Sequence, residues 1–328
     1  MEIRSSYNPA FTGYKSAFSK KLEKALSAPK NTRKSADRLL NDFAKMYDKK
    51  ICLDSKIGEG FYGSVYKIDD CYVLKRGNEY LEPEFGSIEL VKKRKFGHLK
   101  HYFGEAIAKI TNTVGEDMSI LKNVYSKGIS IPVGIPDKFS RTHTKDEGLK
   151  YYNDTYLPKF SRLPQRSFDG IAKDFAQLNK MCTKRKSYFF DFLNPNNFVL
   201  SGKTLRILDE INEDMVITKN CVTDMFEVFI NKMDLDRDAL FDKNLIPFRK
   251  EMTKKLILAG ARHNVPMCQS KTDLPPWGTT FNKLLGFKKS ENELWDITKE
   301  IDNLVQKTKN PKKRVELVKQ YLEEIVGL

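Results

Sequence analysis

The stretch Ile57 to Lys75, IGEGFYGSVYKIDDCYVLK, decides how this chain is interpreted. Gly58, Gly60 and Gly63 form the pattern G-x-G-x-x-G, and an apolar run ends in the lysine. We expect two short strands joined by a tight turn at Asp69-Asp70, with the glycines at the first bend and the lysine on the second strand. Glycine lets backbone N–H groups approach phosphate oxygens, and a lysine ammonium can meet the same phosphates. The stretch therefore predicts a grip for a nucleotide triphosphate.

Two other interpretations of these glycines stay open. A dinucleotide-binding turn needs a helix directly after the glycines and an acidic residue about twenty positions later. The residues after Gly63 are Ser-Val-Tyr-Lys-Ile, which favour a strand instead. A hairpin that contains glycines and binds nothing is the remaining alternative, so the rest of the chain has to decide.

The composition limits which partners and which cellular compartment we expect. The chain has 328 residues, 58 of them Lys or Arg and 43 Asp or Glu, which gives a net charge of +15. This balance favours an acidic partner, such as a phosphoinositide membrane, an inositol polyphosphate, nucleic acid or an acidic protein. The five scattered cysteines form no C-x-x-C pair and predict free thiols in a reducing, cytoplasmic compartment. The sequence contains no apolar stretch of membrane-spanning length.

Periodicity predicts further elements on both sides of the glycine stretch. We expect a short basic helix over Tyr14–Ser27 and an edge or bulged strand over Ile129–Ile135, which contains a proline. Phe168–Met181 has apolar residues at spacings of three and four and predicts an amphipathic helix. Other helices are expected over Ser35–Tyr47, Cys221–Met233, Leu240–Ala261, Glu291–Lys307 and Lys312–Val326.

A second informative stretch lies between Tyr188 and Glu210. It predicts a loop that enters a strand at Phe198, then a turn, and then a strand that leads to Asp209. Loop carboxylates and amides of this kind suit phosphoryl transfer. One carboxylate orients the attacking hydroxyl, while an amide oxygen and a second carboxylate hold metal ions. The alternative is that such aspartates only form turns.

Together the two stretches resemble the protein kinases over about residues 51 to 235. The resemblance implies an α+β, bilobal fold, with a small β-rich N-lobe over 51–160 and the catalytic part of a helical C-lobe over 161–235. A helical extension would precede it over 1–50, and another would follow over 236–328. The resemblance also implies ATP and Mg²⁺ or Mn²⁺ as cofactors. The nucleotide would be held by Gly58, Glu59, Gly60, Phe61, Gly63, Val65 and Lys75.

The resemblance assigns roles to further residues. Asp191 would orient the substrate hydroxyl, while Asn196 and Asp209 would bind the metal. A helix over about Tyr102–Thr113 would bring Glu105 to the nucleotide lysine. A strand over Thr155–Phe160 would lead to a hinge where Leu157 meets the adenine. Other glutamates compete with Glu105 for its role, namely Glu82, Glu84 and Glu89.

The register of the catalytic loop is open by one residue. Asp191 and Asn196 match the kinase spacing D-x-x-x-x-N, and Asp209 follows at a spacing common in the family. In the alternative register, Asn197 is the metal ligand and Phe192 takes the place of the aspartate, so the base is missing. We favour Asp191 with Asn196 because two spacings agree.

Three departures separate the chain from ordinary kinases. Phe189-Phe190 replaces His-Arg, Glu210-Ile211 replaces Phe-Gly after the aspartate, and no A-P-E motif follows. The chain resembles the minimal kinases that bacterial pathogens deliver into host cells. The Legionella effector kinases are the group to compare with it first. The resemblance implies transfer to an unidentified protein substrate, on Ser or Thr more than Tyr.

The alternatives are a pseudokinase, a module that binds inositol polyphosphates or phosphoinositides, and nucleotidyl transfer on the same fold. Nucleic-acid binding is disfavoured, because the lysines are not interleaved with aromatics in a recognisable module. A polyanion that binds the chain could also activate the kinase. The candidate polyanion-binding residues are Lys92, Lys93, Arg94, Lys95, Lys184, Arg185 and Lys186.

Overall fold

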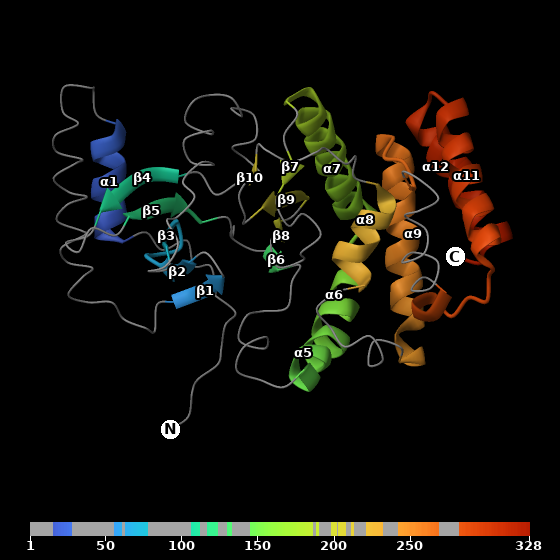
Figure 1. Ribbon diagram of the computed structural model, residues 1–328, viewed down its shortest axis with the longest axis horizontal. Helices are drawn as coiled ribbons and strands as arrows, with labels where there is room; N and C mark the ends of the chain where they lie inside the picture. Colours follow the sequence, from blue (N-terminus) through green and yellow to red (C-terminus); the bar gives the residue numbers. More distant parts are fainter. Residues whose placement is uncertain are drawn as a thin grey trace. The chain divides into compact units, whose positions relative to one another are not determined.

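The computed structural model shows a protein of mixed helices and strands that divides into two compact units, Met1–Ser130 and Ile131–Leu328 (Figure 1). Each unit is described by itself. The structure describes residues 16–27, 56–60, 63–77, 106–111, 117–123, 130–132, 145–185, 188–189, 198–201, 203–207, 211–212, 221–231, 242–268 and 282–328.

The first unit contains a five-stranded antiparallel sheet in the order β1-β2-β3-β5-β4. One face of this sheet is a core, since Tyr66, Leu74 and Ile120 are directly opposite one another and almost fully buried. The strands are β1 (Lys56–Gly60), β2 (Gly63–Lys67), β3 (Tyr72–Gly77), β4 (Ala106–Thr111) and β5 (Asp117–Lys122), and the helix α1 (Ala17–Ser27) precedes them.

The predicted hairpin and the basic helix of the first unit are confirmed, and one predicted helix is wrong. Residues 106–111 form β4 and pair with β5, where we expected a helix over Tyr102–Thr113. The run Ala-Ile-Ala-Lys-Ile-Thr is too short to separate a period of two from one of 3.6. Its β-branched residues and the backbone partners that β5 supplies favour the strand.

The second unit is mainly helical and contains two small sheets. A three-stranded sheet has the order β6-β8-β9, and β7 pairs with β10. The strands are β6 (Ser130–Pro132), β7 (Tyr188–Phe189), β8 (Phe198–Ser201), β9 (Thr204–Ile207) and β10 (Ile211–Asn212). The helices are α5 (Lys145–Tyr151), α6 (Leu157–Ser161), α7 (Gln165–Arg185), α8 (Val222–Phe226), α9 (Ile246–His263), α11 (Glu291–Lys307) and α12 (Pro311–Tyr321).

Single helical turns extend several of these helices. Tyr152–Tyr156, Glu227–Asn231 and Leu322–Val326 are π-helical, and Lys243–Leu245 is a 3₁₀ turn before α9. Proline in β6 agrees with its position at the edge of the sheet, as expected. The predicted helices over Phe168–Met181 and in the C-terminal region are confirmed, including Pro311 in the first turn of α12.

The core of the second unit is an aromatic cluster that corrects another prediction. Tyr152, Tyr156 and Phe160 stack at a spacing of four residues, and all three are at most 2% exposed. This is the period of a helix, and Thr155–Phe160 is helical where we expected a strand. Phe168, Phe175, Phe198 and Phe229 complete the cluster, so α6, α7 and β8 meet there.

Candidate functional site

The glycine hairpin and Lys75 lie on one continuous row of the first sheet. The register pairs Gly58 with Val65, Val65 with Lys75, and Lys75 with Ser119. Residues directly opposite each other on neighbouring strands point to the same face, so the side chains of Val65 and Lys75 lie side by side. Two residues predicted to hold one nucleotide are therefore brought together by the strand pairing.

This face remains partly open, unlike the face that forms the core. Val65, Lys67 and Lys75 keep intermediate exposure, whereas Leu74 and Ile120 are 0% exposed. Residues 60 and 63 are the last pair of the β1–β2 hairpin, so both ends of its bend are glycines that leave the backbone accessible at close range. Phe61 lies outside the described residues, as does Tyr62.

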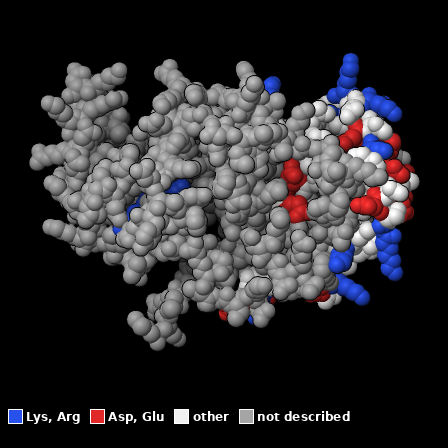
Figure 2. Space-filling model, viewed as in Figure 1, with Lys and Arg blue, Asp and Glu red and all other residues white. Residues whose placement is uncertain are grey.

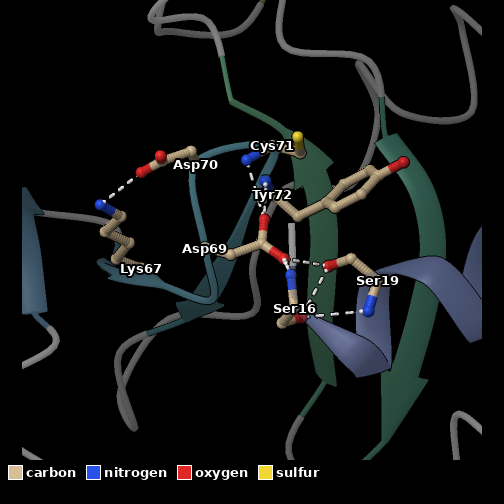
Figure 3. Close-up of polar contacts among 7 residues, drawn as sticks. All are labelled: Ser16, Ser19, Lys67, Asp69, Asp70, Cys71 and Tyr72. Carbon is tan, nitrogen blue, oxygen red and sulfur yellow. Dashed lines mark hydrogen bonds and ion pairs between the residues drawn. The ribbon is translucent and has the colours of Figure 1, made fainter. Parts of the chain in front are cut away.

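The turn between β2 and β3 is organised by the carboxylate of Asp69 (Figure 3). Its Oδ1 accepts hydrogen bonds from the backbone N–H groups of Cys71, at 2.8 Å, and Tyr72, at 3.0 Å. Its Oδ2 accepts from the Ser16 N–H at 2.8 Å and from the hydroxyl of Ser19. Burial raises the pKa of Asp69, but these hydrogen bonds outweigh it and leave the pKa below its ordinary value.

A second contact joins α1 to the same strand. The hydroxyl of Tyr72 donates a hydrogen bond to the carboxylate of Glu23, and burial together with this carboxylate raises the pKa of Tyr72. Near the turn, Lys67 forms an ion pair with Asp70 at 2.7 Å that does not involve α1. Asp69 and Tyr72 thus connect α1 to the strand that carries the lysine.

The candidate catalytic stretch in the second unit is bracketed by two strand pairs. Phe189 pairs with Ile211, and Phe198 pairs with Ile207. Because residues 207 and 211 are four positions apart, the two pairs lie within about 14 Å of each other. Asp191, Asn196, Asn197 and Asp209 lie outside the described residues, in the connections between these pairs.

Helix α7 packs against the β8–β9 hairpin and holds it in position. The buried carboxylate of Asp174 accepts a hydrogen bond from the Leu205 N–H at 2.8 Å. Gly170 lies so close to the turn that a Cβ there would be 1.9 Å from the Lys203 carbonyl oxygen. The hairpin that leads to Asp209 is therefore held by α7 at two points.

Two other predicted site residues, Glu105 and Leu157, depended on predicted elements that the structure replaces. Glu105 lies outside the described residues, and the helix that was to carry it is replaced by β4 directly after it. Leu157 lies on α6 and is 0% exposed among core aromatics, so the strand on which its adenine contact rested is absent from that position. We leave Leu157 out of the proposed site.

The polyanion prediction falls largely outside the part of the chain that the structure describes. Lys92, Lys93, Arg94, Lys95 and Lys186 are not described, and Lys184 and Arg185 belong to the last turn of α7. On the face of the second unit shown in Figure 2, acidic and basic side chains are interspersed near α11 and α12. This described surface does not form a field of one sign.

Among the described residues, no group of three or more His, Cys, Asp or Glu side chains could hold a metal ion. No described helix is long and apolar enough to cross a membrane. Three cysteines whose side chains the structure describes, Cys71, Cys221 and Cys268, are thiols and not disulfides, and two of them are buried.

Sequence reasoning missed three residues that position the candidate site. The Asp69-Asp70 pair was interpreted only as a turn, although an aspartate two positions before N–H groups in a turn is a known signal. Gly170 inside a helical pattern was a usable signal of close packing. The contact of Asp174 with β9 joins residues 31 positions apart, and no local pattern indicates it.

Comparisons with known proteins give no family assignment. No protein-family model matches the chain. No curated protein matches it either.

Proposed function

We propose that this protein is an ATP-dependent phosphotransferase of the protein kinase-like type. The observation that carries the proposal is the row Gly58–Val65–Lys75, which unites a glycine hairpin and a lysine on one partly open sheet face. In protein kinases a glycine-rich loop covers the phosphates, and the lysine is on the third strand, as Lys75 is on β3.

The second unit supports the proposal because two strand pairs flank the segments that contain the candidate catalytic residues. The pairs Phe189–Ile211 and Phe198–Ile207 confine the ends of the segments that contain Asp191, Asn196 and Asp209. In the proposal, Asp191 orients the substrate hydroxyl and Lys75 binds the α- and β-phosphates. Carboxylate and amide oxygens are ligands that suit Mg²⁺, so Asp209 and Asn196 would hold the ion. The bound metal would neutralise charge on the phosphates.

A pair of lysine variants tests the proposal. Lys75→Met should lower phosphoryl transfer from Mg·ATP by about 10²- to 10³-fold, because an electrostatic contact to the phosphates is lost. Lys67→Arg is the control, since Lys67 lies two positions from Val65, on the same sheet face, but pairs with the buried carboxylate of Asp70, which needs a cation. Equal activity in the two variants would contradict the proposal.

The position of the label identifies the reaction. ATP labelled at the γ-phosphate distinguishes phosphoryl transfer from nucleotidyl transfer, which would instead deposit the α-phosphate. Transfer that persists unchanged in Asp209→Ala would remove the metal-ligand assignment. Thermal stabilisation by an inositol polyphosphate, without any by Mg·ATP, would favour the pseudokinase or polyanion-binding alternative, which the +15 net charge motivates.

A further inference from the structure

The N-terminus of α1 and the β2–β3 turn share a single carboxylate. Ser16 precedes the helix, and its hydroxyl accepts a hydrogen bond from the Ser19 N–H at 3.1 Å, which caps α1. The Ser16 N–H and the Ser19 hydroxyl both donate to Asp69 (Figure 3). A helix N-terminus carries partial positive charge, so the carboxylate is favoured there. Fifty positions of chain separate Ser19 from Asp69, which makes this a tertiary contact.

The other oxygen of the same carboxylate organises the hairpin. It accepts the N–H groups of Cys71 and Tyr72, while the Ile68 and Asp69 N–H groups donate to the Tyr72 carbonyl. This turn closes the ladder at Lys67 and Val73. Register in a hairpin is fixed by its turn, and a slip of one residue moves every side chain to the opposite face. The turn at Asp69 therefore keeps Lys75 on the face of Val65.

Tyr72 extends the connection along β3. It lies on the same face as Leu74, opposite to that of Lys75, and is 4% exposed. Its hydroxyl donates to Glu23, two turns along α1 from its start. Helix α1 thus holds β3 from the face that does not bear the lysine, at both the turn and the first residue of the strand.

We propose that α1, docked on the opposite face of the sheet, acts as a clamp that keeps Lys75 in place on the phosphate-binding face, with Asp69 as the positioning residue. The proposal rests on the proposed function for its consequence, which is that release of α1 weakens the grip on the triphosphate. A process that moves α1 away from Asp69 would in this way regulate the nucleotide site.

Three variants and a control separate the parts of the clamp in the 328-residue chain. Ser19→Asp places a second negative charge against Asp69 and leaves the turn hydrogen bonds unchanged, whereas Asp69→Asn weakens both the helix contact and the turn. Ser19→Ala is a milder variant in the same direction, for use if Ser19→Asp does not fold by circular dichroism. Lys67→Arg is the control, because it changes a residue next to the same turn but keeps a cation for the buried carboxylate of Asp70.

Three measurements give the readout. Hydrogen exchange, followed by mass spectrometry, reports on residues 17–27 and 72–77. Acylation of the Lys75 amine reports on its surroundings without any nucleotide, and calorimetry gives the Kd for Mg·ATP. We expect Ser19→Asp to speed exchange in both segments by about tenfold or more, to change the acylation rate of Lys75 and to raise the Kd about tenfold, as for a coupling of ordinary size. Lys67→Arg should match the wild type.

Several outcomes would overturn the clamp. Faster exchange in α1 with unchanged exchange in β3 and unchanged Lys75 acylation would mean that α1 only packs against the sheet. Unchanged exchange in α1 would mean that Ser19 does not hold it. If the wild type binds no Mg·ATP, the proposed function fails, and the clamp is then judged by exchange and acylation, which require no nucleotide.

Discussion

Replacing Gly170 with alanine tests whether α7 determines the position of the hairpin that leads to Asp209. An ideal Cβ at this position would lie 1.9 Å from the Lys203 carbonyl oxygen and 2.8 Å from its carbonyl carbon. Cβ atoms in proteins essentially never approach other atoms closer than 3.0 Å, so helix and turn must separate by about 1.1 Å, the difference between the two distances. The obstructing atoms belong to the backbone, which cannot rotate away as a side chain can.

The size of the effect follows from three contributions. Alanine in a helix interior is more favourable than glycine by about 0.5–1 kcal/mol. Overpacking costs about 1–3 kcal/mol, and the separation stretches the charged hydrogen bond from Leu205 to Asp174, which is worth about 1.5–3 kcal/mol. We therefore expect Gly170→Ala to destabilise the second unit by about 2–5 kcal/mol. For a unit of this size the midpoint should fall by about 4–20 °C.

Thermal unfolding by circular dichroism measures this change, and Gly260→Ala is the control. A Cβ at Gly260 in α9 would meet the Val222 side chain at 2.5 Å instead of a backbone atom, so the smaller loss is expected there. Hydrogen exchange should become faster in β8 and β9 for Gly170→Ala only. A Gly170→Ala protein as stable as the wild type would refute the reasoning, since alanine would then fit where the structure leaves no space.

Two smaller effects follow from helix ends and buried charge. Burial raises the pKa of Asp302, although the Met267 N–H donates to it at 2.9 Å. A protein loses stability as the pH rises when one of its acids has a raised folded-state pKa. The stability of Asp302→Asn relative to the wild type should therefore increase as the pH rises above 3.8 and level off once the pH passes the folded-state pKa, which urea denaturation at several pH values measures. Ser290 and Glu293 form a capping box at the start of α11, so Ser290→Ala should cost about 1 kcal/mol in urea denaturation, and Ser290→Thr should retain most of the stability.

The parts of the fold that local chemistry determines were predictable from the sequence. The Asp69-Asp70 turn and the turn after Ser201 each join two strands where the sequence predicts a turn. Such turns can be predicted because turn residues limit the backbone to few conformations. The long helix α7 was predictable because its apolar period extends over several turns. Such signals need no knowledge of distant partners.

The two wrong elements are short apolar runs whose conformation depends on partners outside the run. Ala106–Thr111 is a strand because β5 provides the backbone hydrogen-bond partners. The run at Tyr156 and Phe160 is helical because its aromatic side chains reach Phe229, about seventy positions later. Phe160 stacks on the Phe229 ring, and the Tyr156 hydroxyl donates a hydrogen bond to the Phe229 carbonyl. A run of six residues contains too few periods to distinguish a strand from a helix. For this reason the predicted positions of Glu105 and Leu157 were the weakest part of the predicted site.

A pair of asparagine variants can decide the one-residue ambiguity of the catalytic loop. β8 begins at Phe198, directly after both candidate amides, Asn196 and Asn197. The resemblance to protein kinases assigns the metal to one of these two amides. We expect Asn196→Ala to raise the Mg²⁺ concentration needed for half-maximal phosphoryl transfer by about tenfold or more and Asn197→Ala to leave it near the wild-type value. The reverse order would move the register by one residue and place Phe192, which has no proton-accepting group, where the base belongs.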